Sequence, residues 1–250
     1  MSELRFESRS LQLFPPTLPE IDPQTVQIWQ SDLTGSDREL AAWRNTLSDD
    51  EKERADRYCF DRDAIAFVAG RGQLRSLLGQ YLNLAPTQIK FIYSKTGKPQ
   101  LDPRLNPHQL VFNVSHSRDR IVYAISRDRW VGIDLEAIRP IPKLQQLADR
   151  FFTPYEAKSL QALPPHHQQL AFLRGWTRKE AFLKATGVGI AQLQAVTVSL
   201  SPDDPALLQV PPNEPLEDWL LCDLPLPAGY VGAIALKGKP IHLQGFHLKP

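Results

Sequence analysis

Two long stretches with helical periodicity divide the chain into halves of similar order, and this repetition restricts the fold more than any other feature. The first is Asp61 to Leu82, and the second is Gln168 to Ala185, which Gly187 ends as a C-terminal cap. Short apolar segments separated by turn residues accompany each helix and are typical of antiparallel strands. We therefore expect an α+β fold with two similar α/β subdomains in one chain, related by a pseudo-twofold. Each subdomain should pack one long helix on a small antiparallel sheet.

The order of elements predicts a boundary near residue 127, giving an N-terminal subdomain over 1–127 and a C-terminal one over 128–250. Residues 1–23 are proline-rich and aperiodic, which predicts an irregular arm, and Pro202 to Pro215 predicts a loop. Hydroxyl–acid pairs of the capping-box type predict three helix starts at Ser36/Glu39, Ser48/Glu51 and Thr153/Glu156. Strands are expected over Thr25–Gln30, Ile89–Tyr93, Leu110–Val114, Ile121–Ile125, Trp130–Leu135, Val196–Leu200, Trp219–Cys222 and Tyr230–Leu236, and a further helix over Phe151–Leu163.

The composition excludes several classes of protein. Lys and Arg total 29 against 28 acidic residues, without the basic excess that is typical of nucleic-acid binders. The N-terminus lacks the apolar core of a signal peptide, and no apolar run reaches the ~20 residues of a membrane span. The two cysteines, Cys59 and Cys222, show no metal or disulfide spacing. We expect a cytoplasmic protein that binds neither nucleic acid nor membranes.

Asp134 and Glu136 form the first candidate site, in the segment VGIDLEAI. Residues two apart on a strand point to the same face, so the two carboxylates would lie side by side and repel each other unless a cation compensates. Carboxylate oxygens are the ligands that Mg²⁺ prefers. The alternative interpretation is an ordinary strand with one solvated face.

Glu180 and Lys184 lie four residues apart in the second long helix and therefore share a face with Trp176. The pair could be an ordinary surface ion pair. Lys179 is expected on a neighbouring face. His166 and His167 follow two prolines without ligand-type spacing, so we assign them to a loop and not to zinc.

Two further segments could bind phosphate. Asn113, Ser115 and His116 in FNVSHS end a strand with several hydrogen-bonding groups, although a simple turn would use the same residue types. Lys95 and Lys98 flank a glycine in SKTGKP, where two cations suit a pyrophosphate and a solvated hairpin loop is the alternative.

These segments occur in the order TGKP, FNVSHS, GIDLE, FFTPYE and WTRKEAFLKATG. In this order and at these spacings, spanning about Lys95 to Gly187, they resemble the phosphopantetheinyl transferases, in particular the larger single-chain type that activates surfactin synthetase and related carrier proteins. The first ~50 and last ~60 residues match the family in little beyond length and strand pattern. The segment Asp63-Ala64 departs from the family, because two uncharged residues follow where some relatives have a basic one.

The resemblance implies that coenzyme A binds in a cleft between two subdomains and that its 4′-phosphopantetheine arm passes to a serine of an apo carrier protein, with Mg²⁺ and release of 3′,5′-ADP. It implies Asp134, Glu136 and Glu180 as metal-binding acids, and Asp134, Glu180 and Lys184 as catalytic residues. Glu180 is then the general base, and Lys184 assists the departing nucleotide. The coenzyme A contacts that it implies are Arg54, Lys95, Lys98, Asn113, Ser115, His116 and Lys184.

The expected partners are acyl, polyketide or peptidyl carrier domains, and the resemblance implies that the carrier is acidic. They would dock near Ile138 to Leu163, and since one chain holds both halves we expect an active monomer. Two alternatives stay open. One is a metal-dependent phosphohydrolase acting on coenzyme A or a nucleotide, and the other is a non-catalytic coenzyme A-binding protein.

Overall fold

The computed structural model describes residues 6–12, 18, 20–212, 214–238 and 242–249. The fold is mixed α+β, and the chain divides into two compact units. Unit 1 comprises Met1–Val111, Arg118–Asp128 and His242–Pro250, and unit 2 comprises Phe112–Ser117 and Arg129–Ile241. Both units therefore contain segments from either side of residue 127, and the simple division into 1–127 and 128–250 stays a prediction.

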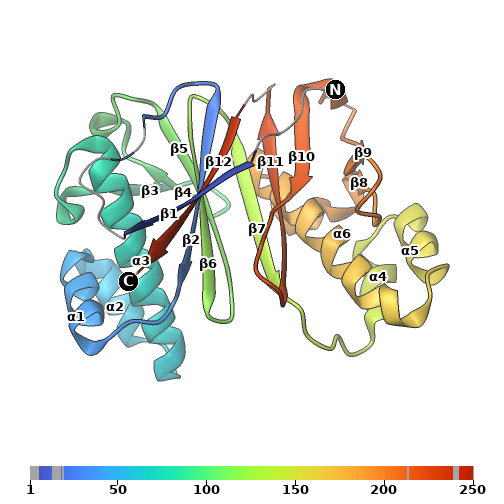
Figure 1. The fold of residues 1–250 in the computed structure, drawn as a ribbon, viewed down its shortest axis with the longest axis horizontal. Coiled ribbons are helices and arrows are strands. Elements are labelled where there is room, and N and C mark those ends of the chain that lie inside the picture. Colours follow the sequence, from blue (N-terminus) through green and yellow to red (C-terminus); the bar gives the residue numbers. More distant parts are fainter. Residues whose placement is uncertain (1–5, 13–17, 19, 213, 239–241, 250) are drawn as a thin grey trace. The chain divides into compact units, whose positions relative to one another are not determined.

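Unit 1 contains a five-stranded sheet with three helices on one side of it (Figure 1). The strand order is β1-β12-β2-β6-β5, with β3 and β4 forming a separate hairpin. Trp29 of β2 stacks on Phe246 of β12 with ring centroids 4.5 Å apart. The elements are β1 (Phe6–Gln12), β2 (Thr25–Asp32), α1 (Asp37–Thr46), α2 (Asp49–Asp56), α3 (Asp61–Leu82), β3 (Phe91–Tyr93), β4 (Pro99–Leu101), β5 (Leu110–Ser117), β6 (Arg120–Arg127) and β12 (His242–Lys249). Strand β5 passes from unit 1 into unit 2, to which its residues Phe112–Ser117 belong.

Unit 2 is built on the three-stranded antiparallel sheet β10-β11-β7. Helix α6 packs on this sheet, and the shorter helices α4 and α5 pack on α6 (Figure 1). The aromatic rings of Phe152 and Phe172 stack in the core between these helices. The elements are β7 (Val131–Ala137), α4 (Leu144–Phe151), α5 (Pro154–Gln161), α6 (Pro165–Thr186), β8 (Thr197–Val198), β9 (Leu207–Gln209), β10 (Trp219–Asp223) and β11 (Tyr230–Lys237).

Gly132 allows α6 to lie unusually close to β7. A Cβ atom added at this position would collide with the carbonyl oxygen of Ala181 and with the backbone of Ala185. Only glycine therefore permits this approach. Since alternate strand residues share a face, Asp134 and Glu136 lie on the same face of β7 as Gly132, toward α6.

Local sequence signals define the helix ends well. Reciprocal capping boxes are present at Ser36 and Thr153, as predicted. The predicted helix start at Ser48 is also confirmed, and there the Glu51 carboxylate accepts from the backbone N–H of Ser48. Gly187 adopts a left-handed conformation with φ of 75° and ends α6, which confirms its expected role as a cap. The predicted span of α3 is also confirmed.

Three expectations about the strands are wrong. Phe6–Gln12 of the predicted irregular arm forms β1, while residues 1–5, 13–17 and 19 of that arm lie outside the described residues. The sheet of unit 1 is not purely antiparallel, because β12 pairs in parallel with both β1 and β2. The predicted loop over Pro202–Pro215 contains the short strand β9. In each case the pairing partner is distant or short, so local periodicity does not reveal it.

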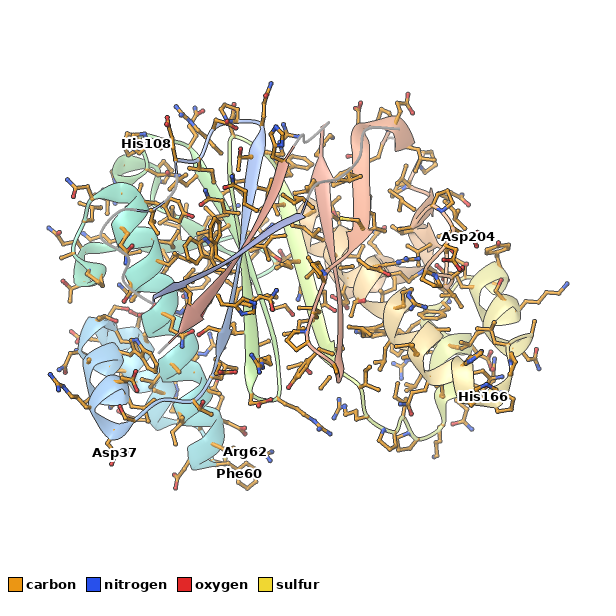
Figure 2. All side chains as sticks on the ribbon, viewed as in Figure 1. Asp37, Phe60, Arg62, His108, His166 and Asp204 are labelled. Atoms are coloured by element: carbon orange, nitrogen blue, oxygen red, sulfur yellow. The ribbon has the colours of Figure 1, made fainter. Side chains whose placement is uncertain are left out.

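The helices of unit 2 differ from the prediction at two places. The single helix expected over Phe151–Leu163 is two helices, because the chain is extended at Phe152 and Thr153 before the capping box starts α5. His166 and His167 belong to the first turn of α6 and not to a loop, since Pro165 occupies the first helical position. Figure 2 shows His166 on the surface near this helix start.

Candidate active site

An acidic cluster forms where β7 faces α6 in unit 2. Asp134 is 5% exposed, whereas Glu136 and Glu180 are each half-buried. Lys184 lies one turn beyond Glu180 on α6, and its Nζ donates to Asp134 Oδ1 at 2.6 Å. Lys184 therefore takes part in the acidic cluster, and the interpretation of Glu180 and Lys184 as an isolated surface pair is wrong.

Burial and mutual repulsion make the ionised acids costly at this position. Burial raises the pKa of Glu180, the charges of Asp134 and Glu136 raise it further, and Lys184 opposes the shift. Burial likewise raises the pKa of Glu136, against a hydrogen bond from Ser117 that lowers it. A group of partly buried carboxylates with raised pKa values is typical of a functional site and unfavourable as a purely structural one.

Two side chains of β5, those of Asn113 and Ser115, contact β7 beside the acids. Ser115 Oγ donates to Asp134 Oδ1 at 2.9 Å and lies 3.0 Å from Lys184 Nζ, which donates to it. Asn113 Oδ1 accepts a hydrogen bond from the backbone N–H of Ile133 at 2.8 Å. The structure therefore brings Asn113 and Ser115 together with the acidic cluster.

His116 is exposed, whereas Ser115 and Ser117 beside it on β5 are buried and half-buried. Partial burial of the ring lowers the pKa of His116, the charge of Lys184 lowers it further, and Asp134 acts in the opposite direction. These influences place the imidazole within electrostatic range of both partners. A neutral ring at this edge can donate one hydrogen bond to a ligand phosphate.

One oxygen of the acidic cluster could accept a divalent cation. Asp134 Oδ2 is buried and has no hydrogen-bond partner among the described residues, which is an unfavourable state for a carboxylate oxygen unless a ligand completes it. Oxygen ligands from Asp134, Glu136 and Glu180 match the preference of Mg²⁺. Among the described residues, no group of three or more His, Cys, Asp or Glu side chains is arranged as a metal site, so the three acids are not assembled as a ligand set here.

The candidate phosphate residues of unit 1 lie on two separate elements. Lys95 and Lys98 occupy the turn between β3 and β4, where the backbone N–H of Lys98 donates to Ser94 Oγ and Gly97 takes φ of 81°. Arg54 lies on α2, with its guanidinium 4.9 Å from the centre of the Phe67 ring. All three residues are basic side chains of unit 1.

The sequence reasoning missed two features of unit 2. Ser117, the last serine of FNVSHS, donates to Glu136 Oε2 at 2.9 Å, and its spacing of two from Ser115 was the available signal. Lys179 is fully buried and donates to both carboxylate oxygens of Glu156, at 2.8 and 2.6 Å. The predicted neighbouring face for Lys179 is therefore the core-facing side of α6.

Comparison with known proteins points to one family. Residues 130–235 match the family model of the 4′-phosphopantetheinyl transferase superfamily, and residues 31–127 match that of a 4′-phosphopantetheinyl transferase N-terminal domain. The chain is 42% identical to the 4′-phosphopantetheinyl transferase HetI of Nostoc sp. over 90% of this chain and 92% of that protein.

More distant relatives carry similar names. The chain is 33% identical to the 4′-phosphopantetheinyl transferase psf-1 of Bacillus pumilus over 76% of this chain and 79% of that protein. It is 35% identical to the human L-aminoadipate-semialdehyde dehydrogenase-phosphopantetheinyl transferase over 63% of this chain and 54% of that protein. With both family models covering most of its length, the chain belongs to the 4′-phosphopantetheinyl transferase superfamily.

Proposed function

We propose that this chain transfers the 4′-phosphopantetheine arm of coenzyme A to a serine hydroxyl of an apo carrier protein. The observation that carries the proposal is the acidic cluster of Asp134, Glu136, Glu180 and Lys184 in a chain of this superfamily. The serine oxygen forms a bond to the β-phosphorus, and the bond from that phosphorus to the oxygen of 3′,5′-ADP breaks.

Glu180 is proposed as the base that accepts the proton of the carrier serine. Its raised pKa improves its ability to hold that proton near neutral pH. Lys184 is proposed to neutralise the charge on the departing nucleotide, for which its contact with Ser115 orients the ammonium group. Asp134 and Glu136, with Glu180, would hold Mg²⁺, which when bound supplies charge neutralisation at the pyrophosphate.

The remaining site residues are proposed as contacts to coenzyme A. Asn113, Ser115 and His116 would bind near its phosphates from β5, and the charges of Arg54, Lys95 and Lys98 would bind its nucleotide phosphates. Only positive or hydrogen-bond-donating groups suit that role, and these side chains provide them. The assignment remains a proposal for each residue.

The carrier protein is proposed to dock near Ile138 to Leu163 of unit 2. This segment exposes the apolar side chains of Ile138 and Tyr155, the latter 61% exposed. The same segment also exposes four basic side chains, which suits an acidic partner. They are Arg139, Lys143, Arg150 and Lys158.

Duplication of one subdomain plan is also proposed, and matching anchors support it. In each unit a capping-box glutamate on an eight-residue helix pairs with a buried cation on a 22-residue helix. The pairs are Glu51–Arg75, 24 residues apart, and Glu156–Lys179, 23 residues apart.

We further propose that the protein acts as a monomer in the cytoplasm. No helix of the described residues is both long and apolar enough to cross a membrane.

The test of the function is the intact mass of an apo carrier protein after incubation with this protein, coenzyme A and Mg²⁺. A mass gain equal to one phosphopantetheine group on the carrier, absent without coenzyme A, is the expected result. Phosphate release without a carrier would instead favour the phosphohydrolase. Coenzyme A binding without either product would favour a non-catalytic binding protein.

A further inference from the structure

Alternate side chains of β5 replace a backbone partner along one edge of β7. In the β10-β11-β7 sheet, β7 is the end strand, so its outer N–H groups need partners. The N–H of Leu135 donates to Ser115 Oγ at 3.2 Å, and the N–H of Ala137 donates to Ser117 Oγ at 3.0 Å. With the bond from Ile133 to Asn113, three successive outward N–H groups are satisfied by side chains at 113, 115 and 117.

Ser115 and Ser117 each also donate a hydrogen bond to a carboxylate of β7. Ser117 Oγ donates its single hydrogen to Glu136 Oε2 at 2.9 Å, just as Ser115 does to Asp134 Oδ1. Since the N–H of Ala137 occupies a lone pair of the same hydroxyl, the hydrogen of Ser117 has little rotational choice and stays directed at Glu136. One hydroxyl thereby links the backbone N–H of Ala137 to the side-chain carboxylate of the preceding residue, Glu136.

We propose that Ser117 is a positioning residue that holds the Glu136 carboxylate in the orientation required for its ligand. The inference rests on the proposed metal-binding role of Glu136. Groups that hydrogen-bond to metal-ligating carboxylates fix ligand orientation, and their removal typically weakens metal affinity by about 10–100-fold. Ser117 is a cleaner test than Ser115, because Ser115 also contacts Lys184 and belongs to the proposed coenzyme A contacts.

The test compares Ser117→Ala with Ser117→Thr, which keeps the hydroxyl. The probe is Mn²⁺, whose binding to the protein with coenzyme A present is followed by its electron paramagnetic resonance signal. Ser117→Ala should weaken Mn²⁺ binding by about 10-fold or more, and Ser117→Thr should remain within about 3-fold of native. Ser201→Ala is the matched control, since Ser201 Oγ likewise accepts a backbone N–H, that of Asp203 at 3.1 Å, and its loss should leave Mn²⁺ binding unchanged.

Kinetics provide a second readout that a general loss of structure would not imitate. Excess Mg²⁺ should restore most of the turnover of Ser117→Ala, because the affinity and not the chemistry is damaged. If Ser117→Ala does not fold, Ser117→Cys takes its place, since a thiol fills similar space but is a weak hydrogen-bond donor.

The outcomes separate this inference from the proposed function. If native protein binds Mn²⁺, Glu136→Gln binds it weakly and Ser117→Ala binds it like native protein, the positioning role is overturned while the metal role stands. Weak binding by both Ser117→Ala and Ser117→Thr would also overturn it. Native protein that binds no Mn²⁺ with coenzyme A would overturn both the metal role and the inference.

Discussion

Each unit contains one buried ion pair between two helices, which we call its anchor, and the units differ in how their other charged groups are paired. In unit 1, Arg75 donates to Glu51 Oε2 at 2.7 Å and to two backbone carbonyl oxygens, and both side chains are almost fully buried. In unit 2, Lys179 and Glu156 form the equivalent anchor. The next residue of unit 2, Glu180, instead belongs to a cluster in which Asp134 Oδ2 lacks a hydrogen-bond partner.

The anchor of unit 2 and the acidic cluster differ in how completely their polar atoms are paired. The anchor of unit 2 leaves little for a ligand to do, because Lys179 Nζ has three acceptors and Glu156 also accepts from the N–H groups of Thr153 and Val198. The acidic cluster has raised pKa values and an incompletely satisfied oxygen, so a cation or substrate can gain free energy there. Adjacent residues of one helix therefore differ in their surroundings: Lys179 is fully paired in the core, and Glu180 lies among acids whose charges raise its pKa.

Breaking an anchor should have the largest effect on stability. Lys179→Met leaves the Glu156 carboxylate buried without its cation, which should lower the free energy of unfolding by about 3–5 kcal/mol. Arg75→Met should cost a similar amount in unit 1. Urea denaturation would measure both. A loss below about 1 kcal/mol for Lys179→Met would show that the anchor is not structural.

Removing the central acid should have the largest effect on activity. Asp134→Ala should lower transfer by about 10³-fold, because the cluster loses the contact with Lys184 and a proposed metal ligand. The fold should persist, since the change also removes repulsion from Glu136 and Glu180. Circular dichroism and the carrier mass assay check both statements. Near-native transfer at ordinary Mg²⁺ would mean that the acids are only a solvated strand face.

The proposed nucleotide contacts should show a smaller and selective effect. Lys98→Ala and His116→Ala should each weaken coenzyme A by about 10-fold, and dephospho-coenzyme A less, if they touch the 3′-phosphate. Titration calorimetry with both ligands measures this. Equal losses for the two ligands would assign the residues to the pyrophosphate, and unchanged binding would remove them from the site.

The smallest effect concerns stability and pH. The pKa of Glu180 is raised above its ordinary value of 4.5 in the folded state. Between the pKa of the unfolded chain and that of the folded state, the native protein therefore binds more protons than the unfolded chain. Its contribution to stability therefore decreases as pH rises through that window. Glu180→Gln should be slightly more stable than native protein at neutral pH, by less than about 1 kcal/mol, and should lose this advantage near pH 4. Thermal melts across pH test the sign, and a variant less stable at neutral pH would contradict it.

Local signals in the sequence predicted the helices and the acid-bearing strand, because caps and periodicity act over a few residues. The bounds of α3, the capping boxes and the Gly187 cap are examples. The parallel pairing of β1 with β12 was not predictable in this way, since it joins segments more than 200 residues apart. Residue types and spacings predicted the candidate site residues, of which the structure brings Ser115, Asp134 and Lys184 into contact. The burial of Lys179 and the bond from Ser117 to Glu136 depend on packing, which no local pattern reveals.

The most direct test of the account is the turnover of Glu180→Gln and Lys184→Met between about pH 6 and 9, followed by the mass of the carrier protein. Glu180→Gln keeps the size of the side chain and removes its basicity, so turnover should fall by about 10²-fold or more while coenzyme A affinity changes much less. Lys184→Met should also turn over slowly, and raising the pH should not rescue it, because no base is missing. Near-native turnover by both variants would leave family membership intact and contradict the roles proposed for Glu180 and Lys184.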